Sequence, residues 1–316
     1  MHKIIIKVPH RVSGFFEIVD EINGIKIEDL EKVGSRGAGF NLNSFGKTEI
    51  IVEDSTDQSQ PTCQIYINNE ELNEKAETSY FIFNYLKKLF KREIHVKIFH
   101  TFELPVGCGF GASGSGALGI VNGLDLLLNL GLPVHERARI AHIAEVINKT
   151  GLGTVCGLLA GGLCILSEPG YPCKYERIKV PPNIIVICGS FGIIPTKSVL
   201  SNPILSSRIK QAGIKALSKL KQDPNINNFV SVSKDFVYDT KMLELLKLDN
   251  IKELLDDLNK IKIIGASMNQ LGRSVYSLCK REDEGKVLDI FESFRPKIKI
   301  FKSTIRKSRA ISVKRN

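Results

Sequence analysis

A glycine- and serine-rich segment in the first half of the chain contains residue types that suit phosphate binding. Between Pro105 and Gly116, glycine stands at positions 107, 109, 111, 114 and 116, and serine at positions 113 and 115. Glycine permits positive φ values and a close approach of the backbone to a ligand, while the amides that open the following helix carry a positive partial charge. Such a place binds phosphate, and the hydroxyl groups can ligate magnesium or a phosphate oxygen. A tight loop that only packs a helix on a sheet is the alternative.

Two widespread nucleotide-binding motifs do not account for this segment. No lysine closes the loop, as a Walker motif requires. The strand and the acidic residue of a dinucleotide fold are not placed as that motif needs them. We therefore expect a phosphate loop of another kind.

Composition limits the class of protein. The chain has 316 residues, of which 43% are hydrophobic, so it can form one large or two ordinary folded domains. Its longest charge-free stretches, 106–124 and 151–167, are too rich in glycine for bilayer spans, and the apolar run at 4–6 is too short for a secretory signal. We expect a cytoplasmic protein with no membrane partner. The seven cysteines, without a Cys-x-x-Cys pair, predict reduced and mostly buried thiols.

The net charge of +10 raises the question of a polyanionic partner such as nucleic acid. Lysine and arginine are nevertheless spread along the chain, and no series of aromatic residues alternates with them. The densest basic stretch, 297–315, is interpreted as a solvated terminal face. A cleft for a small anionic substrate such as a nucleotide explains the charge as well, so nucleic acid is not the expected partner.

Short β-branched runs and longer amphipathic stretches predict an α+β fold. In the first half we expect strands at 3–8, ending in a turn at Pro9, and at 48–52, 63–67 and 95–101. Apolar residues three and four positions apart predict helices at 77–90, 117–130 and 134–148.

Pro181 and Pro182 mark the expected domain boundary. Residues 1–180 would form an N-terminal kinase domain with the phosphate loop, and residues 181–316 a C-terminal domain. The predicted strands of the second half are 184–188, 274–278, 298–301 and 310–313. Its predicted helices are 207–221, 236–248, 251–259 and 283–294.

The loop resembles the phosphate loop of the superfamily that contains galactokinase, homoserine kinase, mevalonate kinase and phosphomevalonate kinase. The pattern of that superfamily is Pro-x-x-x-Gly-Leu-Gly-Ser-Ser-Ala, and the chain matches it at Pro105, Gly109, Gly111 and Ser113. The conservative departures are Phe110 for leucine, Ala112 for the first serine and Gly114 for alanine. The resemblance implies nucleotide binding by Pro105, Gly107, Gly109, Phe110, Gly111, Ala112, Ser113, Gly114 and Ser115.

Within the superfamily the chain is most similar to the archaeal pantoate kinases, on short strings that cover almost its whole length. These strings are 13–17 (SGFFE), 34–40 (GSRGAGF), the loop itself, 144–145 (AE) with 150–153 (TGLG), and 266–268 (ASM). The resemblance implies phosphorylation of the 4-hydroxyl of (R)-pantoate with ATP and Mg²⁺, giving 4-phosphopantoate in archaeal coenzyme A biosynthesis. It also implies an N-terminal domain like domain 2 of ribosomal protein S5, a ferredoxin-like C-terminal domain and an active site between them. Dimers are common among such kinases, so a homodimer is allowed.

The same resemblance assigns catalytic roles outside the loop. Glu145 matches the carboxylate that helps to hold magnesium, with Ser113 as its hydroxyl partner, and a solvated helix glutamate is the alternative. Arg11 stands where superfamily members carry lysine or histidine, and would steady the transferring phosphoryl group or the substrate. A surface ion pair is the other interpretation of Arg11.

The acceptor substrate is expected at the glycine-rich turn that contains Ser35, Arg36 and Gly37. A guanidinium binds a carboxylate in a bidentate manner, so Arg36 suits the pantoate carboxylate, unless it is a turn arginine in solvent. Lys197 is a fainter candidate of the same kind. Residues 266–272 are expected to form a loop that faces the site, or simply a turn between a strand and a helix.

Thr154 departs from the family pattern, which reads Gly-Leu-Gly-Asp-Val where this chain has Gly-Leu-Gly-Thr-Val at 151–155. The family aspartate is the expected general base, and such help contributes on the order of a hundredfold to ten-thousandfold in rate. A threonine hydroxyl cannot accept a proton as a carboxylate does, although kinases acting on homoserine manage without this base. His10 is the nearest alternative base, but a lone histidine is more often structural.

Three functions follow from these residues. The first is pantoate kinase, and the second is a kinase of the same superfamily that acts on a different hydroxy acid or alcohol, which Thr154 would favour. The third is a non-catalytic basic protein that binds RNA through an S5-like fold. A pure RNA-binding protein needs neither the serines of the loop nor Glu145, which disfavours the third.

Overall fold

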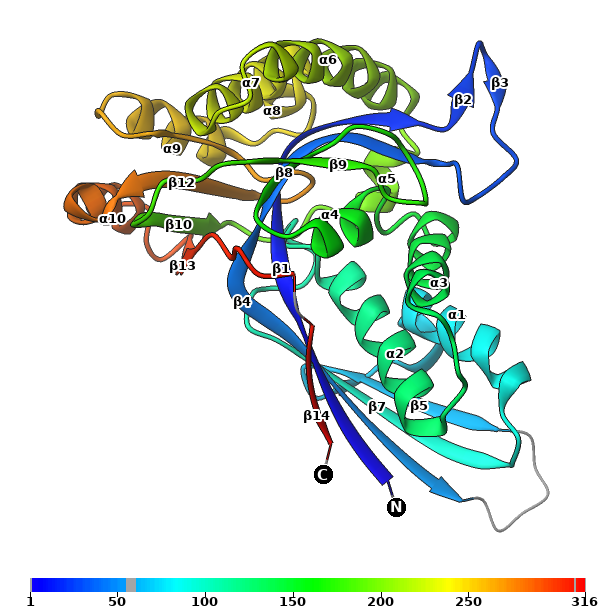
Figure 1. Ribbon diagram of the computed structural model, residues 1–316. Helices are drawn as coiled ribbons and strands as arrows, with labels where there is room; N and C mark the ends of the chain where they lie inside the picture. Colours follow the sequence, from blue (N-terminus) through cyan, green and yellow to red (C-terminus); the bar gives the residue numbers. More distant parts are fainter. Residues whose placement is uncertain (1, 55–60, 310, 316) are drawn as a thin grey trace.

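The computed structural model describes residues 2–54, 61–309 and 311–315, and these residues form two packed parts that share their longest strands (Figure 1). The first part contains a mixed sheet built around β1 (His2–Val19) and β4 (Gly34–Asp54), which pair antiparallel over most of their length. Its order among the described residues is β14-β1-β4-β7-β5-β6, and β8 pairs with both β4 and β9. The remaining strands are β5 (Thr62–Ile67), β6 (Glu70–Glu71), β7 (Ile94–Phe102), β8 (Leu163–Leu166), β9 (Tyr175–Ile178) and β14 (Ser312–Arg315).

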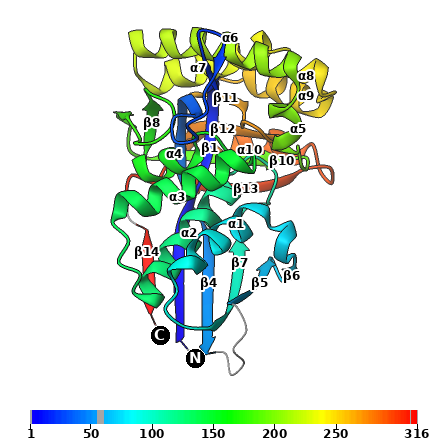
Figure 2. The same ribbon diagram turned by 90° about the vertical axis from the view of Figure 1, so that its right-hand side faces the viewer.

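Three helices cover one face of this sheet, as Figure 2 shows: α1 (Glu77–Leu86), α2 (Ala112–Leu128) and α3 (Val134–Ile147). Alternate strand residues such as Ile50 and Ile98 point to that face and are buried with Val121 and Leu124 of α2. Helix α2 packs on both β1 and β4. The start of α2, where the glycine loop ends, is therefore fixed against the two longest strands.

The second part contains an antiparallel sheet of order β11-β12-β10-β13. Its strands are β10 (Ile184–Ser190), β11 (Gly265–Met268), β12 (Ser274–Lys280) and β13 (Lys299–Thr304). Its helices are α5 (Thr196–Leu200), α6 (Pro203–Gln222), α7 (Ile226–Asp239), α8 (Met242–Leu245), α9 (Asp249–Asn259) and α10 (Glu284–Glu292). Single 3₁₀ turns occur at Asn73–Lys75, Lys87–Leu89 and Arg281–Asp283. The chain order of this part is strand, helices, strand, strand, helix, strand.

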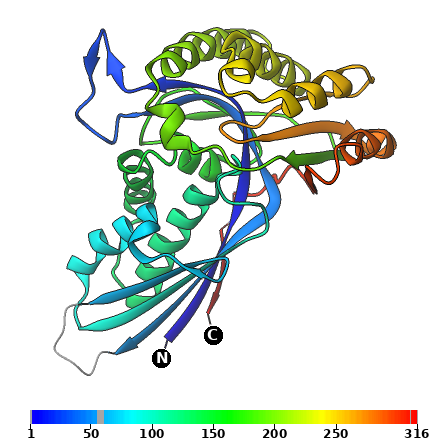
Figure 3. The same cartoon turned by 180° about the vertical axis from the view of Figure 1, so that it is seen from behind.

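The second part packs on the upper halves of β1 and β4 (Figure 3). Phe15 of β1 and Phe40 of β4 are buried against aromatic rings of the second part, namely Phe229, Phe236 and Tyr276. The last strand, β14, returns to the first sheet and pairs with β1. The division at 180/181 stays a prediction, and the end of the chain contributes to the sheet of the first part.

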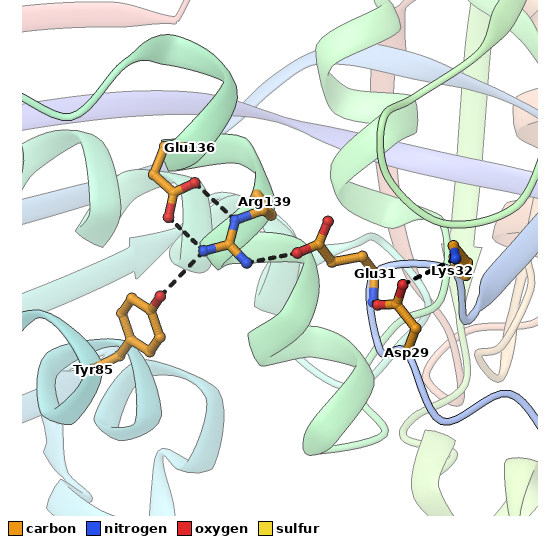
Figure 4. Close-up of polar contacts among 6 residues, drawn as sticks. All are labelled: Asp29, Glu31, Lys32, Tyr85, Glu136 and Arg139. Atoms are coloured by element: carbon orange, nitrogen blue, oxygen red, sulfur yellow. Dashed lines mark hydrogen bonds and ion pairs between the residues drawn. The ribbon is translucent and has the colours of Figure 1, made fainter.

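A short hairpin of β2 (Glu21–Ile22) and β3 (Ile25–Lys26) projects beyond the main body (Figure 1), and ion pairs hold the segment that follows it. Arg139 of α3 donates to Glu136 Oε2 and Glu31 Oε1, both at 2.7 Å, and to the Tyr85 hydroxyl at 3.2 Å (Figure 4). The hydrogen bonds that Arg139 donates to Glu136, the largest cause, and to Glu31 raise its pKa. The chain is thus tied to α1 and α3 just before it enters β4.

Two of the predicted turns are wrong. Strand β1 continues through Pro9, where a register shift between Pro9 and Arg11 accommodates a residue that has no backbone N–H. The glycine-rich stretch at 34–40 lies inside β4. Glycine is needed there because a Cβ on Gly37 would lie 2.4 Å from the Phe15 carbonyl oxygen of β1.

Several predicted elements differ in extent. The helix predicted at 117–130 begins at Ala112, and that at 236–248 is two helices separated by Lys241, whose φ of 53° ends the regular helix. The strand predicted at 310–313 begins at Ala310, outside the described residues, and β14 starts at Ser312. Within the described residues, no helix is long and apolar enough to cross a membrane.

The prediction that all cysteines are reduced is wrong for two of them. Cys156 of α4 (Thr154–Ala160) forms a disulfide with Cys173, in the connection between β8 and β9. The two cysteines are 17 residues apart and meet only because β8 turns the chain back over α4. Five cysteines are free, of which Cys63 is half-buried and four are buried: Cys108, Cys164, Cys188 and Cys279.

Candidate active site

A cavity of about 320 Å³ opens where the two parts of the molecule meet. Its walls are the glycine loop, the upper ends of β1 and β4, the turn between α3 and α4, and the chain around α5. This volume is typical of small-molecule sites. Apolar side chains from five separate segments contribute to the lining: Phe15, Phe16, Leu152, Leu166, Leu200 and Leu271.

The glycine loop forms one end of the cavity. Gly107, Gly109 and Gly111 have φ values of 75°, 87° and 68°, which residues with a Cβ rarely adopt. Gly111 is the N-cap of α2, so Ala112 and Ser113 lie in the first turn of the helix rather than before it. The free amides and positive dipole end of α2 therefore point to the cavity end formed by the loop.

The predicted nucleotide-binding residues fall into two groups. Those that line the cavity are Gly107, Gly109, Phe110, Gly111, Ala112 and Ser113. Pro105, Gly114 and Ser115 do not line it. The Ser115 hydroxyl donates to the Val8 carbonyl at 3.1 Å, and a Cβ on Gly114 would lie 2.7 Å from Thr154 Cγ2. These two residues attach α2 to β1 and α4 from behind.

The second part of the molecule holds the loop from the other side. The Ser274 hydroxyl donates to the Cys108 carbonyl at 2.7 Å, and the Ile194 amide donates to the Gly107 carbonyl at 3.2 Å. A Cβ on Gly272 would lie 1.9 Å from the Cys108 carbonyl oxygen. Of the segment predicted as a loop at 266–272, the first three residues belong to β11, and Gly272 lies in the turn that follows Met268.

Glu145 lies beneath the cavity, on the side of α3 that faces the loop. The residue is buried, and its Oε1 accepts a hydrogen bond from the Thr150 hydroxyl at 2.7 Å. Burial, the largest effect, raises the pKa of Glu145, while the nearby hydroxyl groups of Thr150, Ser113 and Thr154 lower it; of these, only Thr150 lies within hydrogen-bonding geometry of the carboxylate. Its Oε2 has no hydrogen-bond partner, although it is fully buried. The fold thus brings Ser113, Glu145 and Thr154 together from three helices.

The predicted substrate residues line the same cavity as the loop. Ser35, Arg36 and Gly37 line it from β4. Arg36 is not a turn arginine in solvent, because it binds Glu17 in a bidentate manner, with Nε–Oε2 at 2.9 Å and Nη2–Oε1 at 2.6 Å. Lys197 also lines the cavity, from α5, and forms an exposed ion pair with Glu77 at 3.3 Å.

Arg11 is buried and is not part of a surface ion pair. Its Nη1 donates to Asn41 Oδ1 at 3.2 Å and to Cys164 Sγ at 3.6 Å. A Cβ on Gly157 would lie 2.2 Å from Arg11 Cζ, so the guanidinium lies against the middle of α4. The part of Arg11 nearest to the glycine loop is its backbone and Cβ.

Comparison with known proteins identifies the family of the chain. A family model for the GHMP kinases N terminal domain matches residues 78–162. The chain is 30% identical over 285 residues to a pantoate kinase of Methanocaldococcus jannaschii, covering 90% of this chain and 96% of that protein. A pantoate kinase of Thermococcus kodakarensis is also 30% identical, over 88% of each chain.

This chain belongs to the pantoate kinase family.

Solved structures agree with the family. A protein described as a phosphotransferase related to the CoA biosynthesis pathway has a TM-score of 0.85 at 26% identity and covers 99% of both chains. Homoserine kinase from Cytophaga hutchinsonii, at 17% identity and a TM-score of 0.68, has the same fold. Membership of the pantoate kinase family confirms the prediction of an enzyme, an ATP-dependent small-molecule kinase of this superfamily.

One cavity residue of this pantoate kinase family member was not anticipated from its sequence. Lys149 is exposed, has a φ of 53°, and its Nζ donates to the Ser201 hydroxyl at the end of α5 at 3.2 Å. It occupies the position just after the end of α3, where glycine is common. A lysine instead of glycine before Thr150-Gly151 is the signal that could have drawn attention to it.

Proposed function

We propose that this chain transfers the γ-phosphoryl group of ATP to the 4-hydroxyl of pantoate, giving 4-phosphopantoate and ADP. The observation that carries the proposal is its similarity, at 28–30% identity over most of the chain, to three pantoate kinases. The loop and the glycine-rich part of β4 line one cavity, and this arrangement suits a reaction that joins two small substrates.

The loop is the proposed site for the ATP phosphates. Phosphoryl transfer has little covalent chemistry for the protein to perform, so charge stabilisation and in-line positioning account for most of the catalysis. The amides at the start of α2 and the Ser113 hydroxyl supply donors to the phosphate oxygens. Residues such as Gly109 and Gly111 allow the backbone to come close enough for those bonds.

Magnesium fits the residues beside the loop. Glu145 Oε2 is a buried carboxylate oxygen without a partner, and Ser113 is next to it. The described residues contain no group of three or more histidine, cysteine, aspartate or glutamate side chains that could hold a metal ion. Few protein ligands suit Mg²⁺, which keeps waters and substrate phosphates in its shell. We propose Glu145 and Ser113 as its ligands; when bound, the ion would neutralise charge on the phosphates.

The acceptor is proposed to bind at the opposite end of the cavity. Arg36 has donors left beside those bound to Glu17, and they can bind the pantoate carboxylate. Apolar walls such as Phe16 and Leu200 suit the two methyl groups of pantoate. Ser35, Gly37 and Lys197 are further candidates for contacts with this substrate.

Thr154 determines whether the side chain at this position can remove the proton of the acceptor 4-hydroxyl. Its hydroxyl can orient the 4-hydroxyl by a hydrogen bond, but it cannot take the proton as a carboxylate would. When the transition state is loose, the acceptor hydroxyl does not need to lose its proton early in the reaction. We therefore expect turnover that is slower than with an aspartate at this position rather than none.

Several finer statements belong to the same proposal. The strand order of the second part and its alternation with helices support a ferredoxin-like domain that follows an S5-like domain. The catalytic set would be Glu145, Thr154 and Arg11, the last if its guanidinium turns toward the cavity when substrates bind. A cytoplasmic homodimer remains part of the proposal.

The test is ADP release by the purified protein with ATP and Mg²⁺ and a panel of pantoate, mevalonate, homoserine, shikimate and pantothenate. The proposal predicts selective turnover of pantoate. Selective turnover of another member would overturn pantoate as substrate and keep the kinase. Thr154 is the specific observation that favours this second function, since the family pattern places an aspartate there.

A further inference from the structure

His10 connects strand β1 to both ends of the glycine loop. Its side chain is fully buried, and it does not line the cavity. Nδ1 lies 2.9 Å from the Phe110 carbonyl oxygen, and Nε2 lies 3.4 Å from the Leu104 amide nitrogen. Leu104 comes directly before the loop, and Phe110 comes directly before Gly111, where the loop leads into α2. The single ring of His10 therefore contacts the chain at both places.

The partners of His10 fix which ring nitrogen carries the proton. A carbonyl oxygen can only accept a hydrogen bond, so Nδ1 must donate to Phe110. A backbone N–H can only donate, so Nε2 must accept from Leu104. Only the neutral ring with its proton on Nδ1 meets both conditions. The neutral ring agrees with the pKa of His10, which burial, the largest effect, lowers to about 4 although the backbone carbonyls of Phe110 and Phe45 raise it.

The bond to Phe110 determines the direction of the next amide. In a planar trans peptide, the carbonyl of one residue and the N–H of the following residue point in opposite directions. The Phe110 carbonyl points to His10 and to the Arg11 amide, which donates to it at 3.1 Å. The Gly111 N–H therefore points away from β1, and Gly111 lines the cavity whereas His10 does not.

We propose that His10 is a positioning residue for nucleotide binding, which aims the Gly111 amide at the ATP phosphates by holding the Phe110–Gly111 peptide. The proposal rests on the proposed function in one respect, namely that the loop binds ATP. It gives His10 a role other than the substitute base considered from the sequence, because both ring nitrogens are already bonded away from the cavity.

The test compares three substitutions by equilibrium titration with a non-hydrolysable ATP analogue and Mg²⁺. Asparagine places an amide nitrogen near the position of Nδ1, so His10→Asn can still donate to Phe110. Glutamine places its amide near Nε2, and His10→Gln and His10→Ala lose the bond that orients the peptide. We expect the dissociation constant to rise by about tenfold or more in the Gln and Ala variants and to stay within about threefold of the native value in the Asn variant.

His100→Asn is the matched control. His100 is also buried, and burial lowers its pKa to about 4, but its ring bonds to the hydroxyls of Thr48 and Ser79 and not to the loop. The control should lower the thermal midpoint without changing nucleotide affinity. It thereby separates loss of a buried ring from loss of the loop contact.

The outcomes distinguish the inference from the proposed function. If the native protein binds no nucleotide, the proposed function fails and the inference fails with it. If the native protein binds and the Ala and Gln variants bind equally well, only the inference is overturned. An Asn variant as weak as the Ala variant would also overturn it, and if the Ala variant does not fold, the comparison of Asn with Gln decides. Under the inference, the KM for pantoate should remain unchanged while the KM for ATP rises.

Discussion

Backbone groups form the proposed phosphate end of the cavity, whereas side chains form its proposed acceptor end. At the phosphate end, loop carbonyls of Gly107, Cys108 and Phe110 bond to the scaffold, and backbone lies so close to backbone that Gly272 has no room for a Cβ. At the proposed acceptor end, side chains dominate, and those of Arg36 and Lys197 are 36% and 61% exposed.

This difference suggests how a pantoate kinase separates its two tasks. The geometry that binds ATP depends on the packing of the whole fold, so damage there should cost stability and nucleotide affinity together. Under the proposed function, selection of the acceptor depends on a few side chains rather than on the backbone contacts of the loop. The predictions below test that separation, from the largest effect to the smallest.

Gly272→Ala should have the largest effect. Its Cβ would clash with the Cys108 carbonyl, and neither backbone can move without shifting the loop. We expect a loss of roughly 3 kcal/mol or more in the free energy of unfolding, together with loss of nucleotide binding, measured by urea unfolding and by titration. Gly285→Ala on α10 is the control, because nothing lies within 4 Å of its Cβ. If Gly272→Ala behaved like this control, the loop would not be held as described.

Glu145→Gln should reduce turnover by about a hundredfold or more, since a neutral amide is a poorer ligand for magnesium. The same change should leave stability equal or higher, because burial raises the pKa of Glu145 and so disfavours its charged form in the folded protein. Steady-state kinetics and thermal midpoints measure the two effects. Unchanged turnover would remove Glu145 from the site, and a fall in both would indicate a structural role.

Stability should fall as the pH is lowered, because buried neutral histidines resist protonation. Burial lowers the pKa of His10 and His100 from 6.5 to about 4, so the unfolded chain binds more protons between these values. The contribution of these two histidines to the free energy of unfolding is fully present above pH 6.5, decreases below that pH and levels off below pH 4. At pH 5 the loss is roughly 2 kcal/mol for each histidine.

Urea midpoints at pH 7.5 and pH 5 measure this loss in the native protein and in His100→Asn. Both proteins contain Glu145, whose raised pKa changes stability with pH in the opposite direction. The difference between their pH dependences therefore reports the effect of His100 alone. The prediction is that the Asn variant is less sensitive to pH. Equal sensitivity would mean that His100 is accessible to protons in the folded protein.

Arg36→Gln should have the smallest effect and a selective one. Loss of the guanidinium should raise the KM for pantoate by about tenfold and leave the KM for ATP nearly unchanged, while the thermal midpoint falls because the buried Glu17 carboxylate loses its partner. Arg92→Gln is a control for the kinetic effect, because Arg92 also pairs with a carboxylate, that of Asp54, but does not line the cavity. A rise in the KM for ATP would contradict the separation of the two ends.

The phosphate end could be predicted from the sequence because its chemistry is local. Glycine spacing and the following helix are contiguous, and the match to a known loop placed Glu145 and Ser113 in one site. A local sequence pattern does not show which distant residue each side chain will contact. The Arg36–Glu17 pair joins two strands whose register depends on bulges, and β1 was expected to end before reaching Glu17.

The same reason explains the other differences. Arg11 lines the cavity beside Gly111, as its predicted role requires, but its guanidinium packs against α4, where Gly157 makes room for that contact. The disulfide of Cys156 with Cys173 depends on the return of the chain along β8. Lys149 and the apolar wall converge from several elements that no single stretch of sequence connects.

The most direct test of the account is ³¹P NMR of the product formed from ATP, Mg²⁺ and pantoate. Transfer to the 4-hydroxyl predicts a phosphomonoester signal that is split into a triplet by the adjacent methylene protons, with ADP formed in equal amount. A doublet would place the phosphate on the secondary hydroxyl. No phosphomonoester, from a protein that binds the ATP analogue, would contradict pantoate as the acceptor.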